Sequence, residues 1–138
     1  MAEFAPRVDP DAALAWWWDF EDGAGDHAFL WVRTRRRVLA RSPTRVEAEE
    51  RAPFFRERWC AWRDADQVRF EGRNGFADFE GSYRFSRRDR GVQVVLEATV
   101  RLRGFWRVGA WLAPPVVRWV LRRDLHGHVK QLMRELAP

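Results

Sequence analysis

Few side chains in this sequence could do acid–base chemistry, and the histidines are the first to consider. There are three of them, His27, His126 and His128. On a helix, His126 and His128 would point about 200° apart, so they do not suit a shared metal ion. Asp26 precedes His27. Such a pair either orients a catalytic base or forms a simple local hydrogen bond in a loop.

The sequence contains no motif for nucleophilic, phosphate-binding or metal-dependent enzymes. Ser42, Ser82 and Ser86 lack the G-x-S-x-G motif and a neighbouring histidine, which argues against a serine hydrolase. There is no phosphate loop and no dinucleotide fingerprint. Cys60 is the only cysteine, which excludes an internal disulfide and a cysteine-based metal site. We therefore assign no catalytic residue, no metal ligand and no cofactor.

Polar side chains within strand patterns are better candidates for a binding site. Residues 55–63 alternate in a way that allows two registers. If Glu57 and Trp59 face inward, a carboxylate is buried and needs a partner. If Arg58 and Cys60 face inward instead, an arginine enters the interior. A slip of one residue exchanges the two faces of a strand, so both alternatives stay open.

Tyr83 shares one face of a predicted strand, residues 76–86, with Phe79 and Phe85. The apolar face of the next predicted strand, residues 92–102, indicates that this face is the inner one. The Tyr83 hydroxyl would then lie in an apolar cavity, where it could orient a carbonyl or quinone of a ligand. The alternative is a core tyrosine whose hydroxyl reaches water.

The N-terminal quarter of the chain contains the signals for a strand and a helix. Residues 1–8 have a weak alternation that suits a short strand. A helix is predicted to begin after Asp9, whose side chain can cap it, and to end by Gly23 or Gly25. The following segment, residues 25–30, fits a second short helix or a loop.

The rest of the chain predicts an antiparallel meander and a long helix. Asn74-Gly75 is the strongest hairpin signal. Each strand has one apolar face, so one side of the sheet must be covered, and a helix from Pro114 to Leu136 can cover it. Its apolar stripe contains Val117, Leu121, Leu125, His128, Leu132 and Leu136. The six predicted strands are residues 29–40, 45–51, 55–63, 67–73, 76–86 and 92–102.

The composition indicates one domain, residues 1–138, with more aromatic surface than a small core needs. Aromatic residues make up 14% of the chain and include nine tryptophans. Surplus aromatic side chains of this kind typically line a cavity or contact a partner. The net charge is +5, but 20 acidic residues are interleaved with the basic ones, so most of the charge should form a paired, solvated surface. The single cysteine and the lack of a signal-peptide pattern suit a cytoplasmic protein.

This order of elements resembles the helix-grip fold of the START-type, birch-pollen-allergen-like superfamily, often called SRPBCC. The segments that show the resemblance are "APRVDPDAALAWWWDF", "FADFEGSYRFSRRDRGVQVVLEATVRL" and "LHGHVKQLMREL". The resemblance covers nearly the whole chain. It implies an α+β fold in which a curved antiparallel sheet of six to seven strands wraps around a long C-terminal helix. The short segment after the first helix implies a reduced second helix and a more open cavity mouth.

Members of this superfamily bind lipids, quinones, polyketides and similar hydrophobic ligands between the sheet and the long helix. The resemblance therefore implies a carrier or sensor of such a molecule, with the oligomeric state open between monomer and homodimer. The side chains expected to line the cavity are Trp59, Phe70, Phe79, Tyr83, Leu96, Val117, Leu121 and Leu125.

Two alternative functions stay open. A minority of the superfamily are enzymes similar to polyketide cyclases or dehydratases, and such an enzyme would use Tyr83, Glu57 or His27 as acid–base groups. A wholly apolar cavity favours the carrier, whereas converging polar groups favour the enzyme. The other alternative is a basic surface that binds nucleic acid, against which the interleaved acids argue.

Trp16, Trp17 and Trp18 are consecutive and would fan across about 200° of a helix, so one buried stripe cannot hold all three. We expect one of them to join Trp106 and Trp111 in an exposed aromatic patch near the cavity mouth. The mixture of aromatic side chains and arginines around these two tryptophans suits transient contact with an acidic membrane surface. The alternative is that these rings close an edge of the sheet.

Overall fold

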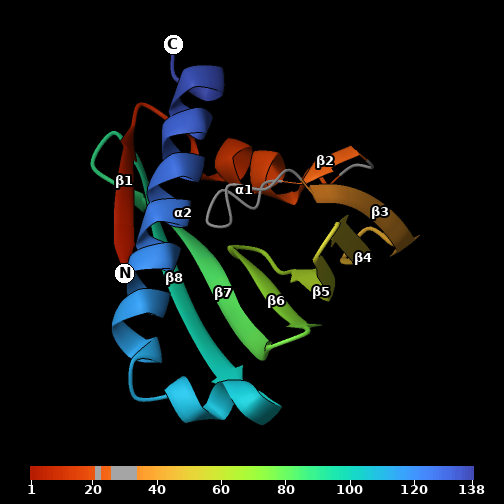
Figure 1. Ribbon diagram of the computed structural model, residues 1–138. Helices are drawn as coiled ribbons and strands as arrows, with labels where there is room; N and C mark the ends of the chain where they lie inside the picture. The colour runs from red at the N-terminus through yellow and green to blue at the C-terminus, as the bar shows by residue number, and fades with distance from the viewer. Residues whose placement is uncertain (21–22, 26–33) are drawn as a thin grey trace.

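The computed structural model describes residues 1–20, 23–25 and 34–138 (Figure 1). The described residues therefore do not include Asp26 and His27. They also leave out the part of the segment 25–30 that follows Gly25 and the start of the strand predicted at 29–40. The elements, in chain order, are β1 (Ala2–Pro6), α1 (Pro10–Trp18), β2 (Gly23–Gly25), β3 (Thr34–Arg41), β4 (Arg45–Ala52), β5 (Phe55–Arg63), β6 (Gln67–Asn74), β7 (Ala77–Arg88), β8 (Gly91–Leu102), η2 (Gly104–Gly109) and α2 (Ala113–Leu136).

The described strands form one antiparallel sheet in the order β1-β8-β7-β6-β5-β4-β3-β2. Strands β3 to β8 are the predicted meander, and β1 adds to its far edge by pairing with β8. The sheet has eight strands, whereas six to seven were expected, because the three-residue β2 pairs with the start of β3. The sequence of β2, Gly-Ala-Gly, has no alternation that could have predicted it.

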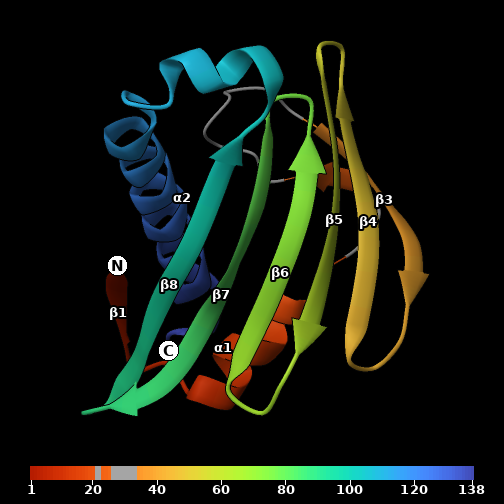
Figure 2. The same ribbon diagram turned by 90° about the horizontal axis from the view of Figure 1, so that it is seen from below.

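Helix α2 packs across β1 and β8 on the inner, concave side of the sheet (Figures 1 and 2). Leu125, Val129 and Leu132 of α2 are buried in the same core as Val94 and Leu96 of β8. Each such side chain stabilises the fold by about 1.5–3 kcal/mol when fully buried. The α+β helix-grip architecture is confirmed, and the predicted start of the helix at Pro114 differs by one residue from its observed start at Ala113.

The hairpin predicted at Asn74-Gly75 is present between β6 and β7. Asn74 closes it through its side chain rather than through a left-handed backbone, since its Oδ1 accepts hydrogen bonds from the backbone N–H groups of Phe76 and Ala77, at 3.1 and 2.8 Å. Asparagine favours such turns because its side chain mimics a backbone carbonyl.

Helix α1 begins as predicted, because Asp9 accepts hydrogen bonds from the backbone of Asp11 and Ala12. It ends at Trp18, earlier than predicted. The buried Trp17 packs on the inner face of β7, against Tyr83 at 4.8 Å between ring centroids.

The other two tryptophans of α1 also have partners. The Nε1 of Trp16 donates a hydrogen bond to Glu135 of α2 over 2.5 Å, and Trp18 lies edge-to-face with Phe20. Because α1 lies beside the C-terminal half of α2 and η2 precedes its N-terminal end (Figures 1 and 2), the predicted patch combining this helix with Trp106 and Trp111 does not form.

The outer face of the sheet carries a network of ion pairs between exposed arginines and less exposed carboxylates, as the interleaved charges predicted. Arg58 bonds Glu47, and Arg56 bonds Glu49 at 2.7 Å. The Arg58 guanidinium holds the pKa of Glu47 below its usual value. The basic side chains of this face are therefore largely neutralised by neighbouring carboxylates.

Candidate functional site

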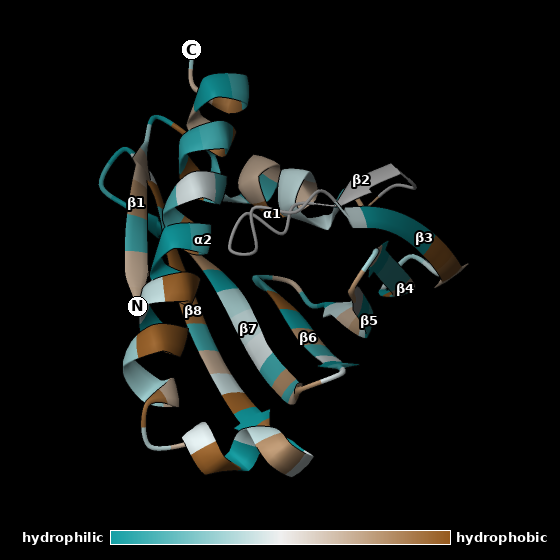
Figure 3. Cartoon of the chain, in the orientation of Figure 1, coloured by the Kyte–Doolittle hydropathy of each residue, from teal (hydrophilic) through white to brown (hydrophobic). Residues whose placement is uncertain are grey.

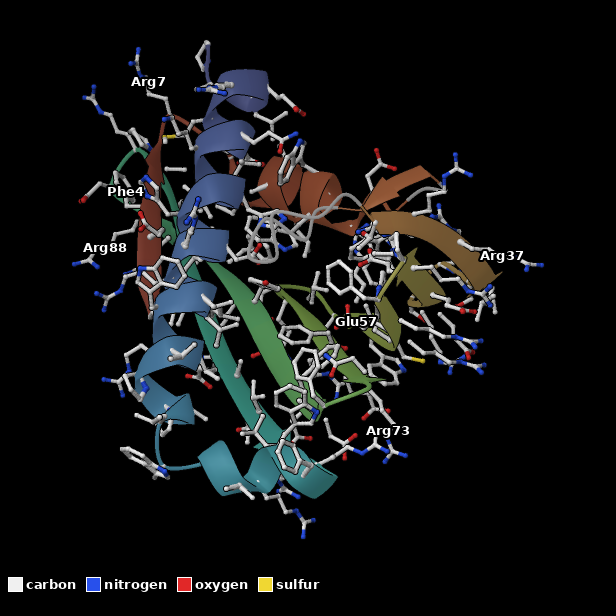
Figure 4. All side chains as sticks on the ribbon, in the orientation of Figure 1. Phe4, Arg7, Arg37, Glu57, Arg73 and Arg88 are labelled. Carbon is white, nitrogen blue, oxygen red and sulfur yellow. The ribbon has the colours of Figure 1, made fainter. Side chains whose placement is uncertain are left out.

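The inner face of the sheet takes the first of the two registers left open for β5. Glu57, Trp59 and Ala61 are buried, whereas Arg56 and Arg58 are exposed on the outer face. Figure 4 shows Glu57 on the inner side and Arg37 and Arg73 directed away from it. The pairing of Ala48 with Trp59 in β4 and β5 sets this register.

Two glycines on the inner face let aromatic rings lean across the sheet. A Cβ atom at Gly72 of β6 would lie 2.2 Å from the tip of the Phe79 ring, and one at Gly81 of β7 would lie 2.7 Å from the tip of the Phe70 ring. The rings therefore occupy the space that side chains would fill at these glycines. They cover the sheet surface, and the Phe70 ring also lies 5.4 Å from the Tyr83 ring.

This aromatic surface remains partly accessible. Phe70, Phe79 and Tyr83 are only half-buried although they lie on the concave face, and Leu121 of α2 is half-buried as well. Val117, one turn earlier, is likewise half-buried. An apolar concave surface of this kind is typical of sites for hydrophobic ligands.

Three of the predicted lining residues are buried. Leu96 and Leu125 are 2% and 1% exposed and belong to the core that joins α2 to β8. They offer almost no surface to a ligand. Trp59 is 9% exposed and packs against Phe20 at 4.9 Å between ring centroids, so it forms a wall of the site.

At one end of the apolar surface, three polar side chains meet. The Tyr83 hydroxyl donates a hydrogen bond to the carboxylate of Asp124 on α2, and burial together with this carboxylate raises the pKa of Tyr83. One turn later, the Nδ1 of His128 lies 2.8 Å from the Asp124 backbone oxygen and 3.4 Å from its carboxylate. The ring of Trp17 closes this end, 5.3 Å from the His128 ring.

The expected role of Tyr83 changes in one respect. Its single hydroxyl proton is directed to Asp124, so it is not offered to a ligand carbonyl as the sequence suggested. Its oxygen can still accept a hydrogen bond, and its raised pKa keeps the phenol neutral. Asp124 and His128 were not among the predicted lining residues, although His128 lies in the apolar stripe of the predicted helix.

At the other end, a row of polar side chains crosses four strands. Arg36, Glu50, Glu57 and Asn74 are successive cross-strand partners on the inner face of β3 to β6. The Nε of Arg36 lies 2.8 Å from Glu50, and the Nδ2 of Asn74 donates to Glu57 over 3.3 Å. The amide orientation of Asn74 is fixed because its Oδ1 accepts hydrogen bonds from N–H groups of the turn, which leaves its Nδ2 as the atom that faces Glu57.

Arg36 also bounds the apolar surface, since its guanidinium lies 5.5 Å from the ring centroids of both Phe20 and Trp59. Of the four side chains in this polar row, only Glu57 was predicted from the sequence as a possible inward-facing group. Glu50 could have been predicted as well, because it alternates in phase with Val46 and Ala48 and therefore shares their inward face.

An open groove of about 700 Å³ is lined by residues of β5 to β8 and the turns beside them. Its lining includes five arginines and three acidic residues, namely Arg56, Arg58, Arg73, Arg101, Arg103, Glu71, Asp78 and Glu80. Arg73 is paired with Asp78 at 2.7 Å. The mixture of signs does not form the uniformly basic stripe that nucleic-acid binding requires.

Two further properties concern the part of the chain that the structure describes. No group of three or more His, Cys, Asp or Glu side chains within it is arranged to hold a metal ion. None of its helices has both the length and the apolar character needed to cross a membrane.

Comparison with known proteins relates the chain to solved structures alone. TTHA0849 from Thermus thermophilus is similar with a TM-score of 0.67 and 19% identity, over 97% of this chain and 92% of that one. CV1439 from Chromobacterium violaceum is similar with a TM-score of 0.54 and 13% identity, over 100% of this chain and 97% of that one. No protein-family model and no curated protein matches the chain. These likenesses support the fold.

Proposed function

We propose that this protein is a START-type carrier or sensor that binds a hydrophobic small molecule, of the lipid, quinone or polyketide kind, in the cytoplasm. The observation behind the proposal is the half-buried aromatic surface of Phe70, Phe79 and Tyr83 on the concave face. A contiguous apolar surface that stays partly accessible is a feature that marks ligand-binding grooves. The site lies between this surface and the half-buried Leu121 of α2.

The polar groups at both ends of the surface favour an amphipathic ligand over a pure hydrocarbon. Asp124 and His128 flank one end, and Arg36 with Glu50 and Glu57 flanks the other. The apolar body of such a ligand would contact the aromatic rings, and its polar group would form hydrogen bonds with the polar side chains at one of the two ends. Few and well-placed polar groups are what fix the orientation of a ligand in an apolar pocket.

A second candidate is an enzyme of the polyketide cyclase or dehydratase type, favoured by the contact of His128 with Asp124. A carboxylate beside an imidazole nitrogen holds the ring in one orientation, as in pairs of a catalytic base and its orienting group. His128 would then move a proton at a ligand carbon or oxygen, while the neutral Tyr83 bonds Asp124. This candidate needs the same site, so ligand binding is tested first.

The binding site can be tested with the neutral fluorescent probe N-phenyl-1-naphthylamine. Ala98→Leu adds an apolar side chain on the inner face, opposite Gly81, and Thr99→Leu adds the same side chain on the outer face of the same strand. We expect Ala98→Leu to weaken probe binding by about tenfold or more and Thr99→Leu to leave it unchanged. Equal probe binding by both variants and the wild type would refute a site on the inner face.

The carrier and the enzyme are then separated with the natural ligand. Native mass spectrometry of protein purified from its own host identifies a bound molecule, which is released and incubated with fresh protein. An unchanged mass and structure of the ligand supports the carrier. Chemical conversion that Asp124→Asn or His128→Gln abolishes, without loss of binding, supports the enzyme.

A further inference from the structure

The end of the molecule formed by η2 and the first turns of α2 exposes an unusual number of large apolar side chains. We call this the apolar tip. Phe105 is 82% exposed, Trp111 is 77% exposed and Trp119 is 53% exposed. Its members are Phe105, Trp106, Val108, Trp111, Leu112, Val116 and Trp119. Brown segments on η2 and on the adjoining end of α2 mark it in Figure 3.

Part of the apolar tip follows from the spacing of residues on α2. Leu112, Val116 and Trp119 are separated by four and three residues, so they share one face of the helix. Val117, Leu121 and Leu125 share a different face, and exposure falls along it until Leu125 is buried. The first turns of α2 are thus apolar on two sides, whereas only one side contacts the protein's own core.

The charge of the chain is concentrated in the same segment. Residues 104–123, which span η2 and the first turns of α2, contain four arginines and no aspartate or glutamate. Since the whole chain has a net charge of +5, the remaining residues sum to +1. Arg107 and Arg118 are exposed, and the guanidinium of Arg123 lies 5.5 Å from the Trp119 ring centroid. In composition, the tip segment therefore differs from the outer sheet face, where acidic and basic residues are interleaved.

We propose that the apolar tip is a docking surface for an anionic lipid bilayer. Tryptophan and phenylalanine suit the boundary between lipid headgroups and acyl chains, while arginine stems lie on apolar surface and their guanidinium groups reach lipid phosphates. The four arginines of residues 104–123, a segment without an acidic residue, complement an anionic surface. The tip projects at one end of the molecule in both ribbon views, so a flat surface can reach it (Figures 1 and 2). The proposal does not depend on the nature of the ligand bound inside the sheet.

Vesicle flotation of the full chain tests this docking surface. The vesicles are phosphatidylcholine alone, or phosphatidylcholine with roughly one part in four of phosphatidylglycerol. We expect the wild type to float with the anionic vesicles at low salt, and to be released from them at high salt. Failure to bind anionic vesicles at low salt, or equal binding to both vesicle types, overturns the proposal.

Matched substitutions then locate the surface. Trp111→Ser and the double variant Arg107→Glu/Arg118→Glu alter the tip, while Leu39→Ser and Arg41→Glu/Arg90→Glu make the same kinds of change at exposed positions elsewhere. We expect the two tip variants to lose about tenfold or more in vesicle affinity, and the controls to lose less than about threefold. Circular dichroism checks that each variant is folded.

Two results would contradict the assignment of the tip. Equal losses in tip variants and controls would mean that general charge or hydrophobicity drives binding. A protein that is dimeric in analytical ultracentrifugation, becomes monomeric with Trp111→Ser and does not bind vesicles would assign the tip to a second copy of the chain. Should Trp111→Ser unfold the protein, the arginine double variant and its control still decide the question.

Discussion

The hydroxyl of Tyr83 on β7 donates a hydrogen bond to the carboxylate of Asp124 on α2. The contact joins the sheet to the long helix at one end of the apolar surface. Desolvation raises the pKa of Tyr83 most, and the charge and hydrogen bond of Asp124 raise it further. The phenol is therefore neutral across the physiological range.

This relationship predicts an alkaline pH dependence of stability. Because the pKa of Tyr83 is higher in the folded protein than its unfolded value of about 10, its contribution to stability is complete below about pH 10 and is lost as the pH rises above it. Tyr83 is the only tyrosine, so near-ultraviolet tyrosinate absorbance reports it alone. We expect no titration of the folded protein in the usual range of tyrosine.

Asp124→Asn is the diagnostic variant for this pair. Removing the carboxylate charge removes its repulsion of the phenolate, so the pKa of Tyr83 should fall towards its usual value. Tyr83→Phe should abolish the absorbance change and the alkaline loss of stability due to this group. A wild-type protein that titrates at the ordinary tyrosine pKa while still folded would contradict the buried hydrogen bond.

A second prediction concerns the glycine under the Phe79 ring. Gly72→Ala places a methyl group 2.2 Å from the ring tip and 2.9 Å from the Arg58 carbonyl oxygen, so both must shift. We expect a loss of about 1–3 kcal/mol in the free energy of unfolding, measured with urea. The displaced ring should also enter the proposed ligand space and weaken binding of the naphthylamine probe.

The matched control for Gly72 is Gly127, which lies in α2 and has open space, with nothing within 4 Å, where a Cβ atom would be added. Gly127→Ala should stabilise the protein by about 0.5–1 kcal/mol because alanine restricts the unfolded chain and favours helix. Wild-type stability and probe binding in Gly72→Ala would be incompatible with a ring lying over this glycine.

A third prediction follows from the contact between α1 and the end of α2. The indole N–H of Trp16 lowers the pKa of Glu135, and Gln131 lowers it further. Trp16→Phe should raise the pKa of Glu135 towards its usual value, observable by NMR of the side-chain carboxyl carbon. Since the folded-state pKa is the lower one, this contribution to stability is present above the unfolded value of about 4.3 and is lost as the pH falls.

Trp18→Phe is the control for Trp16, since Trp18 packs against Phe20 instead. It should leave the Glu135 titration unchanged. If Trp16→Phe and Trp18→Phe move the pKa of Glu135 equally, the hydrogen bond is not its cause.

Local periodicity was enough to predict much of this fold. The alternation in residues 92–102 put Val94 and Leu96 on the buried face of β8, and the helical stripe of Leu125 and Leu132 predicted the core face of α2. Neighbouring residues along one strand or helix have a fixed angular relation, so the order of apolar and polar residues predicts which of them are buried. The order of elements then limited the topology to an antiparallel sheet covered by a helix.

The patterns in the sequence were therefore sufficient for β1, both α-helices, the six meander strands and their apolar faces, and the resemblance added the helix-grip arrangement, whereas β2 and η2 were not predicted. Contacts between distant segments were needed to establish that Glu57 rather than Arg58 faces inward, that Trp16 bonds Glu135, and that Tyr83 meets Asp124. The physical reason is that strand register and side-chain pairing depend on contacts between distant segments. Pairing β4 with β5 selects one of two registers that are locally equivalent, because a shift of one residue exchanges every side chain between the faces.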